Sequence, residues 1–144
     1  MHNGRMAPCL HACRRFVWTC LVALWAGPVG ATILRCEVGY AGATWQVVAR
    51  PVQDPYGQAG VDIDERFVFK PVLVGSPAEI ERINVYVYLH TPSQPVLVQQ
   101  AKYLPPFHWP ADGTPVPLTG RQYLYAGAVQ RELIYQCTLD KEAP

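Results

Sequence analysis

Apolar and polar residues alternate along most of this chain, and a period of two is typical of β-strands that bury one face. The pattern is clearest in residues 82–90, where every second side chain is apolar and the opposite face carries Asn84, Tyr86, Tyr88 and His90. The same alternation predicts further strands over residues 32–40, 44–52, 66–74, 96–103, 122–125 and 131–139. No segment has the sustained 3.6-residue period of an amphipathic helix. The pattern therefore predicts an all-β protein of about seven strands.

Prolines and glycines mark the places where these strands end. Residues 53–65 are polar and rich in Gly and Pro, so they are expected to form a loop. Residues 104–118 contain five prolines and are expected to be irregular. Pro71 falls inside the predicted strand 66–74. Because proline cannot donate a hydrogen bond to a neighbouring strand, this strand is expected at a sheet edge or with a bulge.

The first 31 residues have the organisation of a secretory signal peptide. Three arginines precede a short apolar run over residues 16–25, and small residues follow, with Val29 and Ala31 at the positions that a signal peptidase reads. We therefore predict that residues 1–31 are cleaved, that the protein is periplasmic or extracellular, and that it is not stably inserted in a membrane after cleavage. The alternative is a retained anchor, because residues 16–34 carry no charge, although two glycines and a proline interrupt that stretch.

Cleavage would leave two of the five cysteines, Cys36 and Cys137, which lie on the first and last predicted strands. In an oxidising compartment they have a single intramolecular pairing, so we predict a disulfide that closes a loop of about 100 residues. The predicted fold is an antiparallel two-sheet sandwich formed by one domain, residues 32–144. The spacing of Tyr135 and Cys137 resembles the tyrosine corner of antibody-type domains, and we expect the sandwich to be immunoglobulin-like. The residues identify no family.

Loss of the leader also changes the charge. Three of the 12 basic residues leave with it and all 11 acidic residues stay, so the remaining chain carries a net charge of −2. A nucleic-acid-binding surface needs clustered lysines and arginines, and no run of like charge is present. We therefore predict neither a nucleic-acid partner nor a polybasic membrane patch.

Residues typical of catalysis or metal binding are sparse. His90 and His108 are the two histidines outside the leader, and their spacing is not that of metal ligands. Three carboxylates lie within residues 62–65, but the twelve-residue calcium loop is absent, so a solvated loop is the simpler interpretation. No nucleophile elbow or phosphate loop is present. We therefore predict a protein that is not an enzyme and that holds no metal or cofactor.

The hypothesis of a binding surface rests on two groups of aromatic residues. Residues 103–110 combine Tyr103, Phe107, His108 and Trp109 with three prolines. If exposed, this stiff loop would anchor a partner at little cost in rotamer entropy, whereas the alternative is that its rings fold back and plug one end of the sandwich. A second aromatic surface would be formed by four tyrosines, with sheet packing as the simpler explanation: Tyr86, Tyr88, Tyr123 and Tyr125.

The sequence thus predicts an exported, non-catalytic interaction module, whose protein partner in the cell envelope or extracellular space is unknown. The first alternative is a small-ligand or carbohydrate-binding domain that uses the aromatic loop and the tyrosines. A more distant alternative is a secreted hydrolase that uses His90 or His108 with a nearby acid.

Overall fold

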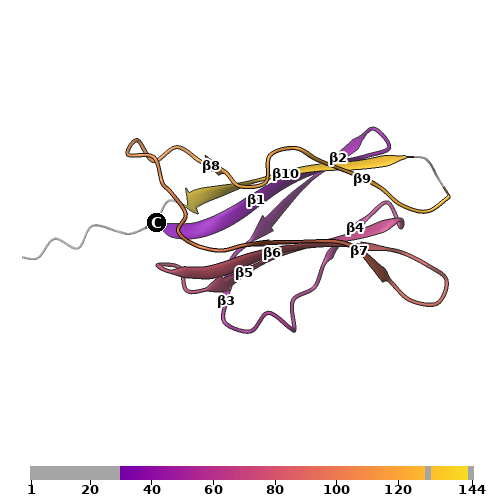
Figure 1. The fold of residues 1–144 in the computed structure, drawn as a ribbon, viewed down its shortest axis with the longest axis horizontal. Helices are drawn as coiled ribbons and strands as arrows, with labels where there is room; N and C mark the ends of the chain where they lie inside the picture. Colours follow the sequence, from indigo (N-terminus) through magenta and orange to yellow (C-terminus); the bar gives the residue numbers. More distant parts are fainter. Residues whose placement is uncertain (1–29, 129–130, 143–144) are drawn as a thin grey trace, which may run out of the picture.

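Two layered β-sheets form the protein (Figure 1). The computed structural model describes residues 30–128 and 131–142. All ten secondary-structure elements in that part of the chain are β-strands. The first sheet contains β1 (Ala31–Tyr40), β2 (Ala43–Ala49), β8 (Val116–Pro117), β9 (Gln122–Tyr125) and β10 (Glu132–Glu142). The second contains β3 (Pro51–Val52), β4 (Val61–Ile63), β5 (Phe67–Gly75), β6 (Ile80–Leu89) and β7 (Val96–Tyr103). The predicted all-β fold with two sheets is confirmed.

The seven predicted strands are present with small shifts at their ends, and three short strands were not predicted. β3, β4 and β8 are two or three residues long and lie in stretches expected to be loops or the end of a longer strand. The predicted strand 44–52 is in fact divided at Arg50, since β2 belongs to the first sheet and β3 to the second. β3 pairs with β5 in parallel, so the second sheet is mixed rather than purely antiparallel.

The core lies between the two sheets and consists of the apolar positions of the alternating pattern. Phe69 of β5 meets Tyr135 of β10 with ring centroids 5.1 Å apart, and Tyr40 of β1 meets Phe67 edge-on at 5.4 Å. Such tilted and edge-on contacts add to the stabilisation from apolar burial. The side chains at these facing positions are fully buried, including Leu34, Val38, Ile83, Val85, Val87, Leu133 and Leu139.

The predicted disulfide joins β1 to β10. Cys36 lies directly opposite Cys137 in the antiparallel register, with their Cα atoms 4.1 Å apart. The bridge therefore connects neighbouring strands of one sheet, whereas the bridge of antibody domains crosses between two sheets. A buried disulfide of this kind is consistent with an oxidising compartment.

Pro71 lies where β5 lacks a second partner. β6 pairs with β5 along one side, but on the other side β4 pairs with Phe67–Phe69 and β3 with Leu73 and Val74. The intervening position is unpaired on that side, which accommodates a residue without an N–H group. β5 is thus an interior strand rather than the predicted edge strand, with a local gap in pairing at its proline, and its register shift lies further on, at Val74 and Gly75.

The predicted leader lies outside the described residues except for Gly30 and Ala31, and β1 begins at Ala31. Within residues 30–128 and 131–142 no helix is long and apolar enough to cross a membrane.

Candidate functional site: a tyrosine-lined hollow on the second sheet

The aromatic loop, residues 103–110, turns most of its rings toward the core. Tyr103 ends β7 opposite the buried Ile83, and Phe107 and Trp109 are half-buried and pack against the core cluster. His108 is exposed. Burial raises the pKa of the Tyr103 phenol above its usual range, because a buried phenolate would lose its hydration. The loop therefore closes the space between the sheets, while a docking role for it stays a prediction.

A basic side chain at the end of β10 holds this loop in place. The Lys141 Nζ atom lies 4.5 Å from the centre of the Trp109 ring, which is within the range of a cation–π contact. The same ammonium group donates a hydrogen bond of 2.7 Å to Thr32 Oγ1 on β1. Figure 1 shows the chain crossing from β7 in one sheet to β8 in the other beside these strand ends. Trp109 is thus tied to both strands that the disulfide joins.

Tyr86 and Tyr88 have a different environment, because they lie on the outer face of β6. Their neighbours Val85 and Val87 face the core and are fully buried, whereas the two tyrosines are half-buried. Their ring centroids are 6.3 Å apart and their planes differ by 30°. The structure therefore brings these two predicted site residues together and separates them from the aromatic loop.

The two tyrosines line a hollow of about 480 Å³ that sequence reasoning missed. We call it the tyrosine hollow. Its other walls come from β5, β7 and the chain between β3 and β4. The lining residues are Pro55, Tyr56, Lys70, Arg82, Asn84, Tyr86, Tyr88, Gln100 and Lys102.

Local structure explains why the chain between β3 and β4 can form one wall. The carboxylate of Asp54 accepts a hydrogen bond of 2.9 Å from the Tyr56 N–H, and Gln58 donates to the Asp54 carbonyl at 3.2 Å. This turn keeps Tyr56 in the open, where 90% of its surface is exposed. Gly60 then returns the chain to the sheet so closely that a Cβ atom there would collide with the side chain of Val68. The wall is therefore built by a self-bonded turn and a glycine.

The charged residues that line the tyrosine hollow are all basic. Lys70, Arg82 and Lys102 lie on three neighbouring strands, and no acidic residue is among its described lining. None of these three cations forms an ion pair with a described side chain, although Arg35, Arg50 and His90 all have acidic partners. Unpaired positive charges around a concave surface raise the local concentration of anions.

A nearly buried amide also lines the hollow. Asn84 is 4% exposed, and it is not among the described buried polar atoms without a hydrogen-bond partner, which are Gln99 Oε1 and Tyr135 OH. An amide group supplies two donors and an acceptor, so Asn84 can bind polar groups of a ligand that enters the hollow.

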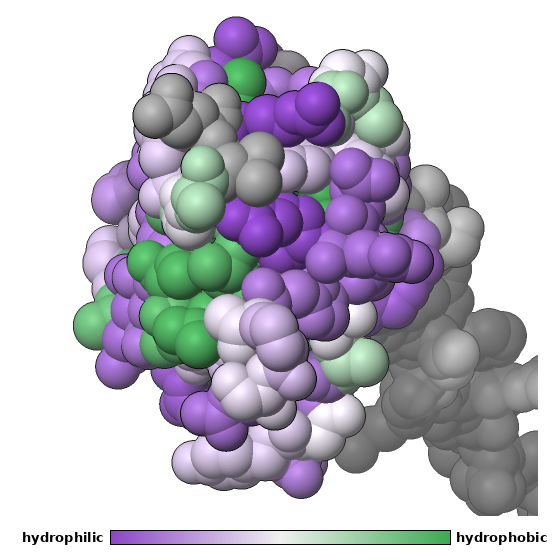
Figure 2. All heavy atoms as spheres, turned by 90° about the vertical axis from the view of Figure 1, so that its right-hand side faces the viewer, coloured by the Kyte–Doolittle hydropathy of each residue, from purple (hydrophilic) through white to green (hydrophobic). Residues whose placement is uncertain are grey.

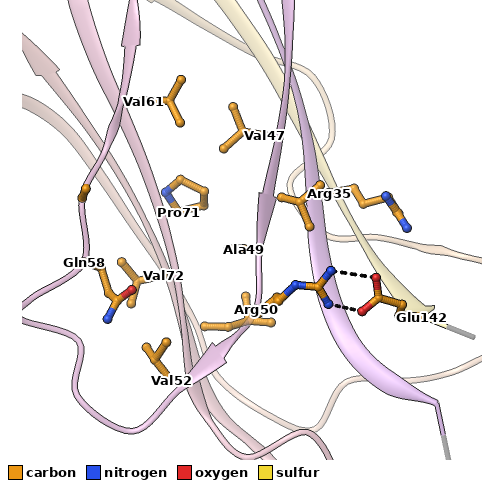
Figure 3. Close-up of a pocket in the computed structure, with 13 residues that line it drawn as sticks. Arg35, Val47, Ala49, Arg50, Val52, Gln58, Val61, Pro71, Val72 and Glu142 are labelled. Atoms are coloured by element: carbon orange, nitrogen blue, oxygen red, sulfur yellow. Dashed lines mark hydrogen bonds and ion pairs between the residues drawn. The ribbon is translucent and has the colours of Figure 1, made fainter. Parts of the chain in front are cut away.

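A second cavity, of about 400 Å³, lies between β2 and the edge of the second sheet. Figure 3 shows Val47, Val61 and Pro71 around it, with the ion pair of Arg50 and Glu142 at one side. Both terminal guanidinium nitrogens of Arg50, Nη1 and Nη2, donate hydrogen bonds to this carboxylate, and the hydrogen bond from Arg50 lowers the Glu142 pKa. The charged residues at this cavity are therefore paired, Arg50 with Glu142 and Arg35 with Asp140, and apart from Gln58 the rest of the lining is apolar.

The surface at the far end of the sandwich carries one small hydrophobic patch among hydrophilic side chains (Figure 2). β7 begins at this end, and its first two residues, Val96 and Leu97, are 44% and 45% exposed. Two neighbouring exposed apolar side chains are ordinary on a protein surface.

His90 and one of the loop carboxylates, Asp62, lie in contact at this end of the sandwich. The His90 Nε2 atom lies 2.8 Å from Asp62 Oδ2, so the predicted loop carboxylates include a partner for this histidine. The described part of the chain contains no cluster of three His, Cys, Asp or Glu side chains that could hold a metal ion.

Comparisons of the chain with protein-family models, curated proteins and solved structures find no match. Its function is therefore argued from its own geometry.

Proposed function

We propose that this protein is an exported, non-catalytic binding module and that its ligand occupies the tyrosine hollow. The observation that carries the proposal is the set of three cations, Lys70, Arg82 and Lys102, which line the hollow without an acidic partner among the described side chains. Pockets that bind ligands typically place a few converging polar groups among aromatic or apolar walls. Tyr86, Tyr88 and Gln100 complete such a set here.

The lining favours binding over catalysis. The described residues around the hollow include no histidine, cysteine, serine or carboxylate, which are the usual nucleophiles and general bases. His90 is paired with Asp62 instead. The hollow therefore offers charge, hydrogen bonds and flat apolar surfaces.

Export and the finer fold assignment are parts of this proposal. The signal-peptide organisation of residues 1–31 and the disulfide between Cys36 and Cys137 both support an oxidising compartment outside the cytoplasm. The immunoglobulin-like assignment is supported by the pairing of the first strand, β1, with the last, β10. The spacing of Tyr135 and Cys137 does not add to it, because the Tyr135 hydroxyl has no hydrogen-bond partner among the described residues and the disulfide lies within one sheet. The ligand is accordingly expected in the cell envelope or extracellular space.

A titration of the isotope-labelled mature protein tests this function. Extracellular and envelope material is divided into protein and polysaccharide fractions, and each fraction is added while backbone amide signals are recorded. We expect one fraction to shift the signals of residues 84–88 and 100–102, and Tyr86→Ala to abolish the shifts. Tyr123→Ala, which removes a 57% exposed tyrosine from the other sheet, is the matched control and should leave them unchanged. Shifts confined to other surfaces, or chemical conversion of the added material, would overturn the proposal.

A further inference from the structure

We infer that the ligand of the tyrosine hollow is an acidic polysaccharide, a chain of sugars that carry carboxylates. This inference rests on the proposed binding function and adds the chemical class of the ligand. It is carried by two features of the hollow, namely the spacing of its cations and the groups that lie between them.

The cations are distributed rather than gathered at one point. Lys70 lies on β5 opposite Tyr86, and Lys102 lies on β7 opposite Asn84, so two strand spacings separate them. Neighbouring strands are about 4.8 Å apart, which places the two backbones roughly 10 Å apart. Arg82 lies on the intervening strand β6. A ligand with charges repeated along its length matches this spread better than a single anion does.

The groups between the cations suit sugars. Tyr86 and Tyr88 present ring faces on which the apolar face of a sugar can lie, and Tyr56 extends this surface from the opposite wall. Asn84 and Gln100 each offer amide donors and an acceptor, the combination that hydroxyl groups require. The guanidinium of Arg82 can bind a carboxylate through two parallel hydrogen bonds.

The position of the hollow limits how an extended acidic peptide could bind there. Peptides that join a β-sheet add to a free edge and gain affinity from backbone hydrogen bonds. β6, which supplies four of the nine lining residues, is paired with β5 on one side and β7 on the other, so it offers no edge. β7 is the last strand of the sheet, so an acidic peptide at its outer edge is the competing ligand that the test must distinguish from a glycan.

The test uses three matched probes with the full mature protein and isothermal calorimetry. Tetragalacturonate carries four carboxylates, its methyl ester is the same chain without charge, and tetraglutamate is a peptide with similar side-chain charge. We expect tetragalacturonate to bind and both other probes to bind at least about tenfold more weakly, because the methyl ester lacks charge-assisted hydrogen bonds and tetraglutamate lacks the sugar hydroxyls that the amides can bind. Raising the salt concentration should weaken the binding.

Two substitutions locate the binding. Arg82→Gln and Lys102→Gln should each reduce the affinity for tetragalacturonate by about tenfold, because each removes a charge from the hollow. Arg121→Gln is the control, because it removes an exposed cation next to β9 of the first sheet. It should have little effect on binding. Thermal unfolding of each variant shows that the protein is still folded.

The remaining outcomes separate this inference from the proposed function. Equal binding of the methyl ester in the hollow would refute the need for charge and leave the binding function intact. Equal or tighter binding of tetraglutamate would refute the glycan. Absence of binding by all three probes at millimolar concentration would overturn the inference, while the extract titration would still decide the function. Cleavage of tetragalacturonate would overturn the non-catalytic function itself.

Discussion

The two aromatic regions of this molecule have similar composition and opposite surroundings. In the loop of residues 103–110, Phe107 and Trp109 pack against the core, and Lys141 covers the Trp109 ring. On the outer face of β6, Tyr86 and Tyr88 border a hollow with unpaired cations. The rings of the loop are satisfied within the fold, whereas the three cations of the hollow have no acidic partner among the described side chains. We therefore distinguish a candidate binding surface from a structural plug by its unpaired polar groups, rather than by the density of its aromatic residues.

The largest expected effect comes from the disulfide between β1 and β10, the two strands to which Trp109 of the aromatic loop is tied. Removing the disulfide with Cys36→Ala and Cys137→Ala together should lower the free energy of unfolding by about 4–5 kcal/mol, because the bridge constrains a loop of about 100 residues in the unfolded chain. Urea unfolding measures the change. The reduced wild-type protein is the control for altered packing at the two buried sites. Free thiols in the exported protein, or an unchanged unfolding midpoint in the double variant, would contradict the role of the bridge.

The loop itself provides the next largest effect. Phe107→Ala and Trp109→Ala should each lower the free energy of unfolding by about 2–3 kcal/mol, somewhat less than for a fully buried ring because both side chains are half-exposed. Leu104→Ala is the matched control in the same loop, since Leu104 is 59% exposed and should cost little. Unfolding curves that coincide with the wild type would instead favour the loop as a docking surface.

Tyr135 lies in a third environment, the core between the two sheets, which differs from the outer face of β6. Tyr135 is 1% exposed, its hydroxyl has no hydrogen-bond partner among the described residues, and burial raises its pKa to about 12. Because the folded pKa is above the unfolded value of about 10, the neutral phenol contributes fully below pH 10, and this contribution is lost as the pH rises toward 12. The expected loss is about 2–3 kcal/mol.

Tyr135→Phe tests this environment directly. The variant should be as stable as the wild type at pH 7, or up to about 1 kcal/mol more stable, because it removes a buried hydroxyl without a partner. It should also lose less stability between pH 10 and 12. Unfolding experiments at both pH values measure the difference. A marked loss of stability at pH 7 would show that the hydroxyl makes a hydrogen bond.

The alternating pattern was sufficient to predict the long strands and the inward faces, because burial of one face imposes a period of two. It could not show β3, β4 or β8, which are too short to display a period and exist because a longer strand pairs with them. The tyrosine hollow was also hidden, although Lys70 and Lys102 occupy outward positions that alternation identifies. Their meeting beside Tyr86 depends on the register of three strands, and the proline-rich loop has no period that would reveal its packing.

The central claim is that the tyrosine hollow holds the ligand and that the aromatic loop supports the fold. A map of backbone amide shifts during titration with tetragalacturonate tests it most directly, because both regions report in one experiment. The account predicts shifts at residues 56, 82–88 and 100–102, with residues 105–110 unchanged. Shifts concentrated in residues 105–110, with the outer face of β6 silent, would contradict it.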